Sequence, residues 1–215
     1  MTPYRYLFVL IATLFLSACV NLGGGTPETR HYLLDSVIDR QHEATDTGVD
    51  GLRQAIIAMA PLELAGYLDR PQVVIRIDGN RLHLADYDRW GEPLPEMMTR
   101  VLRENIVSLG QVEAIVDSHS PQAKKADAVL RVTIKRFEGV AGREAALAAR
   151  YTVQDTEQRK ILESRELKLT KELATGGPQA LIDAMSRLLE ELSFRMARDL
   201  ASQVGKGKTG QQSQN

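Results

Sequence analysis

Apolar and polar residues alternate along several stretches of the chain, and this period of two is typical of β-strands. In 73–77 and 82–84 the alternation flanks the turn residues Asp78, Gly79 and Asn80, which predicts a β-hairpin. The same pattern predicts further strands at 31–35, 54–62, 112–116, 130–134, 147–153 and 161–170. The last three follow one another along the chain and are expected to form a meander.

Two longer segments repeat their apolar residues with the spacing of an α-helix. The first covers residues 93–109, and Gly110 follows it at the position of a C-terminal cap. The second covers residues 178–204 and carries one apolar stripe, which covers the sheet or, alternatively, forms a coiled-coil seam with a partner. The polar segments 36–51 and 117–126 are expected to be exposed loops.

Hairpins and two long helices together predict an α+β fold, with a mostly antiparallel sheet and both long helices packed on one face. Periodicity also allows an alternative in which the first three strands flank the meander. Residues 31–204 are expected to form a single domain, and residues 205–215, which lack apolar side chains, a disordered tail.

The N-terminal segment has the layout of a secretory signal. Arg5 precedes an apolar run over residues 7–18 that ends in small residues and is too short to span a bilayer. Residues 1–18 are therefore expected to be a lipoprotein signal peptide. The glycines and proline of residues 19–30 predict a flexible tether with a reach on the order of 20 Å.

The segment Leu16, Ser17, Ala18, Cys19 resembles the lipobox of bacterial lipoproteins, and Cys19 is the only cysteine of the chain. In such proteins the cysteine sulfur carries a diacylglycerol and the new N-terminal amine is acylated, so the implied lipid on Cys19 is covalent and is no cofactor. Two or three acyl chains hold a protein permanently in a membrane. The alternative is an ordinary signal peptide in which Cys19 is incidental.

Charge and composition exclude several classes of function. Removal of residues 1–18 takes away one charged side chain, Arg5, so 26 basic and 28 acidic side chains remain. A chain with this balance lacks the excess of positive charge that is typical of nucleic-acid-binding proteins. The four histidines are His31, His42, His83 and His119. They lie in different segments, and none has a second histidine or a cysteine at metal-ligand spacing, so no metal or cofactor site is expected.

Three segments together resemble the signature of the ABC-type transport auxiliary lipoproteins, whose best-known member is PqiC. They cover residues 64–74, 80–82 and 89–94 and follow one another in the order and spacing seen in that family. The resemblance implies a non-enzymatic accessory subunit of a lipid transport system that supports envelope integrity. It also implies an MCE-domain partner of the PqiB type, a homo-oligomeric ring and the periplasmic face of the outer membrane, and Val20 after the cysteine favours that membrane over the inner one.

A candidate partner interface follows from composition, because aromatic, aliphatic and arginine side chains are enriched at the centres of protein contacts. Its residues are Tyr67, Leu68, Asp69, Arg70, Pro71, Trp90 and Glu92. The alternative for residues 67–71 is a tight turn in which Tyr67 packs on the sheet. For Trp90 it is a place in the core or at the sheet edge.

Two other functions are compatible with the sequence. Asp86, Asp88 and Glu92 are close enough to form the acid and base pair of a lipoprotein hydrolase, although loop carboxylates are usually only solvated. A pilotin-like structural lipoprotein is the second alternative.

Overall fold

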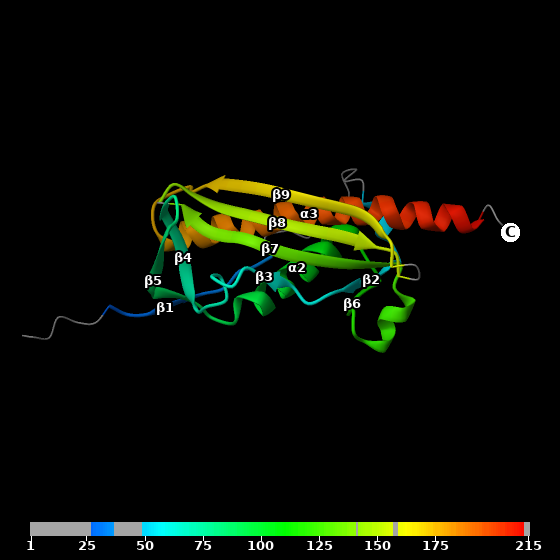
Figure 1. The fold of residues 1–215 in the computed structure, drawn as a ribbon, viewed down its shortest axis with the longest axis horizontal. Helices are drawn as coiled ribbons and strands as arrows, with labels where there is room; N and C mark the ends of the chain where they lie inside the picture. Colours follow the sequence, from blue (N-terminus) through cyan, green and yellow to red (C-terminus); the bar gives the residue numbers. More distant parts are fainter. Residues whose placement is uncertain (1–26, 37–48, 141, 157–158, 213–215) are drawn as a thin grey trace, which may run out of the picture.

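The computed structural model describes residues 27–36, 49–140, 142–156 and 159–212 (Figure 1). Its strands are β1 (Arg30–Tyr32), β2 (Ile56–Met59), β3 (Glu63–Leu64), β4 (Gln72–Asp78), β5 (Arg81–Trp90), β6 (Ala114–Asp117), β7 (Ala128–Val140), β8 (Glu144–Gln154) and β9 (Ile161–Glu172). Its helices are α2 (Leu94–Gly110) and α3 (Pro178–Gln212), with 3-10 turns η1 (Asp50–Leu52) and η2 (Pro121–Lys125).

The sheet is mixed, and the prediction of a mostly antiparallel sheet is wrong. Among the described strands, five of the eight pairings are parallel, namely β1 with β5, β2 with β6, and β7 with β2, β3 and β4. The hairpin β4–β5 and the meander β7–β8–β9 are antiparallel. Alternation along a strand indicates which residues face the core, but it carries no information about the direction of the neighbouring strand.

The long strand β7 is the centre of the sheet. One of its edges pairs with β8 along almost its whole length. The other edge is shared by β2, β3 and β4, which lie beside it one after another in the same direction. Of the first three predicted strands, 54–62 and 73–77 therefore flank the meander, as in the alternative arrangement, while the strand at the start of 31–35, β1, lies at the far edge of β5.

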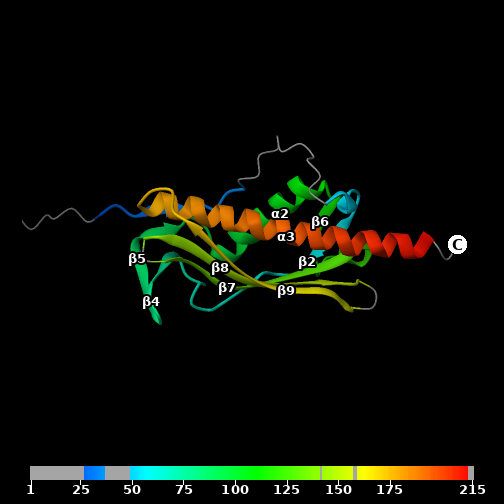
Figure 2. The ribbon, with the colours of Figure 1, turned by 90° about the horizontal axis from the view of Figure 1, so that it is seen from above.

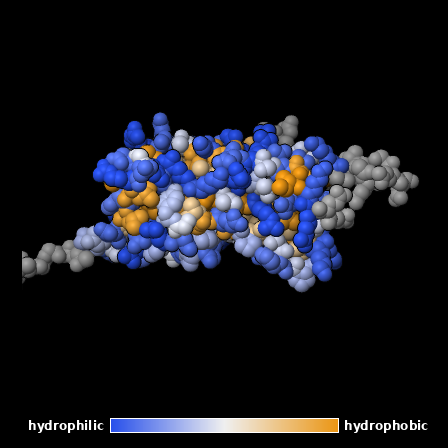
Figure 3. Space-filling model, in the orientation of Figure 1, coloured by the Kyte–Doolittle hydropathy of each residue, from blue (hydrophilic) through white to orange (hydrophobic). Residues whose placement is uncertain are grey.

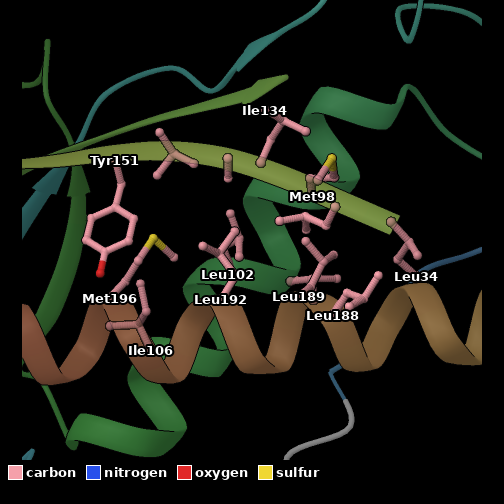
Figure 4. Close-up of a cluster of buried hydrophobic side chains, with 14 of the residues drawn as sticks. Leu34, Met98, Leu102, Ile106, Ile134, Tyr151, Leu188, Leu189, Leu192 and Met196 are labelled. Atoms are coloured by element: carbon pink, nitrogen blue, oxygen red, sulfur yellow. The ribbon is translucent and has the colours of Figure 1, made fainter. Parts of the chain in front are cut away.

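The two helices lie side by side on one face of the sheet (Figure 2). The apolar stripes of both helices meet the inward side chains of β7 and β8. Figure 4 shows Leu102 of α2 with Leu192 and Met196 of α3 in this contact, and Tyr151 of β8 beside Met196. Inside this contact the Asn105 side-chain amide donates a hydrogen bond to Ser193 Oγ at 3.1 Å. The predictions of an α+β fold with two helices and of an apolar stripe in the core are confirmed.

Both helices end differently from the prediction. Gly110 is the last residue of α2, and Gln111 after it takes the left-handed conformation, with φ of 47°. A Cβ at position 110 would lie 2.7 Å from Leu52 Cδ1 and 3.0 Å from Leu52 Cβ, so a larger residue there would force the buried Leu52 side chain to shift. The helix α3 continues to Gln212, beyond Val204, the last residue of the predicted helix.

Candidate functional site

The segment 65–71, called the Tyr67 segment below, connects β3 to β4 and crosses the face of the sheet that the helices leave open. It starts where the Ala65 amide donates to the Ile134 carbonyl of β7. Two tight turns follow, because the amides of Leu68 and Arg70 bind the carbonyls of Ala65 and Leu68. Pro71 cannot donate, but its carbonyl accepts a hydrogen bond of 2.7 Å from the Trp90 amide. The segment is thus fixed at both ends.

A buried carboxylate lies beneath this segment. Glu138 of β7 is fully buried, and the next residue, Gly139, faces Leu181 of α3, so Glu138 points to the opposite face of the sheet. Its Oε2 accepts a hydrogen bond of 2.8 Å from the Tyr67 hydroxyl.

Two arginines neutralise the Glu138 carboxylate. Arg76 of β4 binds both carboxylate oxygens, with Nη2 at 3.2 Å from Oε2, and Arg136 Nε lies 2.5 Å from Oε1. A buried charge is tolerated when it is paired and hydrogen-bonded in this way. We call Tyr67, Arg76, Arg136 and Glu138 the Glu138 cluster.

The protonation states of the Glu138 cluster follow from its geometry. Burial raises the pKa of Glu138, but the hydrogen bonds from Arg76, Arg136 and Tyr67 outweigh burial, and the net pKa lies below its ordinary value. Burial and the neighbouring carboxylate raise the pKa of Tyr67 to about 12. At neutral pH the cluster therefore holds one carboxylate, two guanidinium groups and an un-ionised phenol.

Among the remaining predicted interface residues, Arg70 and Glu92 are half-buried, and the other four are either exposed or buried. Asp69 and Pro71 are exposed at the surface of the Tyr67 segment. Leu68 is 1% exposed and belongs to the core. Trp90 is 5% exposed and stacks on Phe137, with ring centroids 6.4 Å apart. Leu68 and Trp90 therefore hold the segment from below and offer little surface to a partner.

Of the three carboxylates considered for hydrolysis, Asp86 is exposed, while Asp88 and Glu92 bind separate cations. Asp88 accepts a hydrogen bond of 3.2 Å from the Tyr32 hydroxyl and pairs with Arg30 at 2.8 Å. Glu92 pairs with Arg100 of α2 at 2.9 Å. These contacts tie β1 to β5 and the loop after β5 to α2, so they serve the fold. Within the described ranges, no three His, Cys, Asp or Glu side chains are grouped to hold a metal ion.

Sequence reasoning singled out Tyr67 but missed Arg76, Arg136 and Glu138. All three occupy polar positions of alternating strands, which predict solvent exposure. One signal was available, since Arg136 and Glu138 are two residues apart on a strand and must share a face. The covering of that face by the Tyr67 segment was not visible in the pattern.

Cys19, the predicted lipidation residue, lies outside the described residues. Among the described helices, neither is long and apolar enough to cross a membrane.

Comparison with known proteins places the chain in a family. The model of the ABC-type transport auxiliary lipoprotein component matches residues 32–197. The chain therefore belongs to the ABC-type transport auxiliary lipoprotein family, which confirms the family resemblance of the sequence. No curated protein matches the chain significantly.

Solved structures share the fold. The crystal structure of an uncharacterised protein, 16% identical, superposes with a TM-score of 0.66 and covers 81% of this chain and 99% of its own. Protein XCC0632 from Xanthomonas campestris, also 16% identical, has a TM-score of 0.61 and covers 76% of this chain and 92% of its own. A weaker likeness, at 10% identity and a TM-score of 0.45, is to PelC from Paraburkholderia phytofirmans, which crystallised as a dodecamer and covers 68% of this chain and 88% of its own.

Proposed function

We propose that this protein is a non-enzymatic, lipid-anchored subunit of an envelope lipid transport system. Its Cys19 carries the lipid on the periplasmic face of the outer membrane, and its partner is an MCE-domain protein of the PqiB type. Membership of the auxiliary lipoprotein family supports the transport role. The signal sequence and the Leu-Ser-Ala-Cys segment support the anchor.

The observation that carries the partner assignment is the Tyr67 segment itself. An irregular surface segment is normally mobile, and ordering it on binding costs affinity. Here Tyr67 is fixed to a buried carboxylate and Pro71 to Trp90, while Asp69 and Pro71 remain exposed. Such a preformed surface suits recognition of another protein.

The pairing of Asp88 and Glu92 with Arg30 and Arg100 favours a structural role for these carboxylates. Hydrolysis by an acid and base pair requires two carboxylates that flank one scissile bond. The proposal therefore assigns no reaction to this protein.

Capture of the MCE-domain protein by the lipidated chain tests the partner assignment. Asp69→Lys reverses an exposed charge at the surface of the Tyr67 segment and is expected to reduce capture strongly. Glu113→Lys is the matched control, because Glu113 is an exposed acidic residue next to β6, outside the segment. Equal capture by wild type and Asp69→Lys would remove the Tyr67 segment from the interface.

Membrane fractionation and intact mass test the anchor. The exported chain is expected to carry the mass of diacylglycerol and an acyl group, and Cys19→Ser is expected to be soluble in the periplasm and folded. An unmodified thiol on Cys19 would contradict the anchor.

The mass of the purified assembly tests the homo-oligomer, and a monomer at micromolar concentration in detergent would contradict it.

A further inference from the structure

An apolar cavity lies at the end of the domain where β1 enters. It has a volume of about 190 Å³ and is bounded by the hairpin β4–β5, the end of β7 and the first turn of α3. Aliphatic side chains form most of its wall, among them Ile75, Ala85, Leu181 and Ile182. Cavities of about 150 Å³ lined in this way stay dry and take up small hydrocarbons.

The size of the cavity limits its ligand. Sites that enclose a whole drug-sized ligand measure about 300–1,000 Å³. A space of about 190 Å³ accommodates only part of such a molecule, such as the end of an alkyl chain. The rest of the molecule must remain outside, either in water or in a membrane.

The proposed lipid on Cys19 would bring this end of the molecule close to a membrane. Asp88 lines the cavity and also pairs with Arg30 at the start of β1. Figures 1 and 2 show β1, β4, β5 and the start of α3 at the same end. Cys19 is 11 residues before Arg30, a length of chain that spans on the order of 20 Å when flexible. A lipid on Cys19 would therefore hold the cavity within reach of the leaflet.

Exposed apolar side chains continue from the cavity to the surface. Ile77 lies two residues after the cavity residue Ile75, at an irregularity of the β4–β5 pairing, and is 49% exposed. Tyr87, between the cavity residues Ala85 and Asp88, is 38% exposed. Apolar surface over β4 and β5 is visible in Figure 3. Aromatic and aliphatic side chains of this kind are typical of surfaces that touch the interface of a bilayer.

We propose that this cavity holds the end of an acyl chain of a zwitterionic phospholipid from the adjacent leaflet. The charged side chains of its lining are Asp88, whose charge is paired with Arg30, and Glu144, whose carboxylate disfavours an anionic head group. The proposal rests on the proposed function for the position of the cavity, and it makes this subunit one that contacts lipid directly.

Photolabelling in vesicles tests the assignment. The lipidated chain is reconstituted into vesicles of phosphatidylethanolamine and phosphatidylglycerol that contain traces of phosphatidylethanolamine with a diazirine at the end of one acyl chain. After irradiation, label is expected on peptides that contain Ile75, Ala85 or Leu181. The same probe on phosphatidylglycerol is expected to label these peptides less.

A variant that fills the cavity provides the contrast. Ala85→Leu places additional methyl groups in the space and is expected to abolish labelling of the cavity peptides while thermal unfolding shows a folded protein. Ala148→Leu is the control, because Ala148 is a half-buried alanine of β8 that does not line the cavity.

Two results would overturn the assignment. One is a protein that floats with the vesicles but carries no label at the cavity, which leaves the anchor intact. The other is cavity label that appears in Cys19→Ser but not in the lipidated chain, because the acyl groups of the protein itself would then fill the space. Label at the cavity of a protein that does not float supports the lipid site and contradicts the anchor.

Discussion

The hydrogen bond from Tyr67 to Glu138 offers a quantitative test of the candidate site. Tyr67→Phe removes one donor from a fully buried carboxylate, which keeps its contacts with Arg76 and Arg136. Hydrogen bonds to charged groups contribute about 1.5–3 kcal/mol. Because the arginines still satisfy the carboxylate, we expect the lower limit, a loss of about 1.5 kcal/mol in the free energy of unfolding.

Glu138→Gln removes the charge and is expected to cost more. Breaking a buried ion pair costs about 3–5 kcal/mol. The side chains of Arg76 and Arg136 are 24% and 36% exposed, so water can partly solvate them and the loss should be near about 3 kcal/mol. In this background Tyr67→Phe should cost only about 0.5 kcal/mol, because hydrogen bonds to neutral acceptors are weaker.

Urea unfolding of the four proteins in this cycle measures these values. Tyr87→Phe is the control, since Tyr87 is 38% exposed and its substitution should change stability by less than about 0.5 kcal/mol. If Tyr67→Phe is equally neutral, or if its cost does not depend on Glu138, the cluster does not hold the Tyr67 segment.

Three further predictions follow from the described side chains. The lowered pKa of Glu138 contributes stability that is complete above about pH 4.3, the ordinary carboxyl value, and is lost as the pH falls through the folded pKa. The difference in stability between wild type and Glu138→Gln should therefore shrink below about pH 4, and a constant difference would contradict the assignment. Gly51→Ala would place a Cβ 2.7 Å from the Ala201 carbonyl oxygen of α3 and should cost about 1–3 kcal/mol in thermal unfolding, whereas an unchanged melting temperature would mean that α3 shifts freely. Tyr151→Phe removes a hydroxyl that donates to Asp199 Oδ2 at 2.6 Å, and urea unfolding should show a loss of about 1.5–3 kcal/mol in the free energy of unfolding. An unchanged free energy of unfolding would mean that Arg165 alone satisfies the Asp199 carboxylate.

Local patterns predicted the elements of the fold well. The hairpin β4–β5, the meander β7–β9 and both helices were predicted because each depends on neighbours in the sequence. The parallel pairing of β2, β3 and β4 with β7 was not, since it joins residues such as Ile57 and Ala128 that lie far apart along the chain.

The candidate site was predicted only in part. Tyr67 was identified as a side chain of interest, but its partner Glu138 has the sequence pattern of a solvated strand residue. Burial of that carboxylate results from the crossing of the Tyr67 segment over the open face, a tertiary event without a local signal. Trp90, in contrast, stacks in the core on Phe137, as its alternative interpretation had it.

The shared edge of β7 sets the order in which this chain can fold. β3 gains its hydrogen-bonded neighbour, and β2 its second neighbour after β6, only once Ala128–Val140 has been made, roughly a third of the chain later. Until then the N-terminal third offers unpaired strand edges, which invite misassembly. We therefore expect folding of this protein to depend on holding factors until β7 is available, and fragments that end before β7 to accumulate as aggregates.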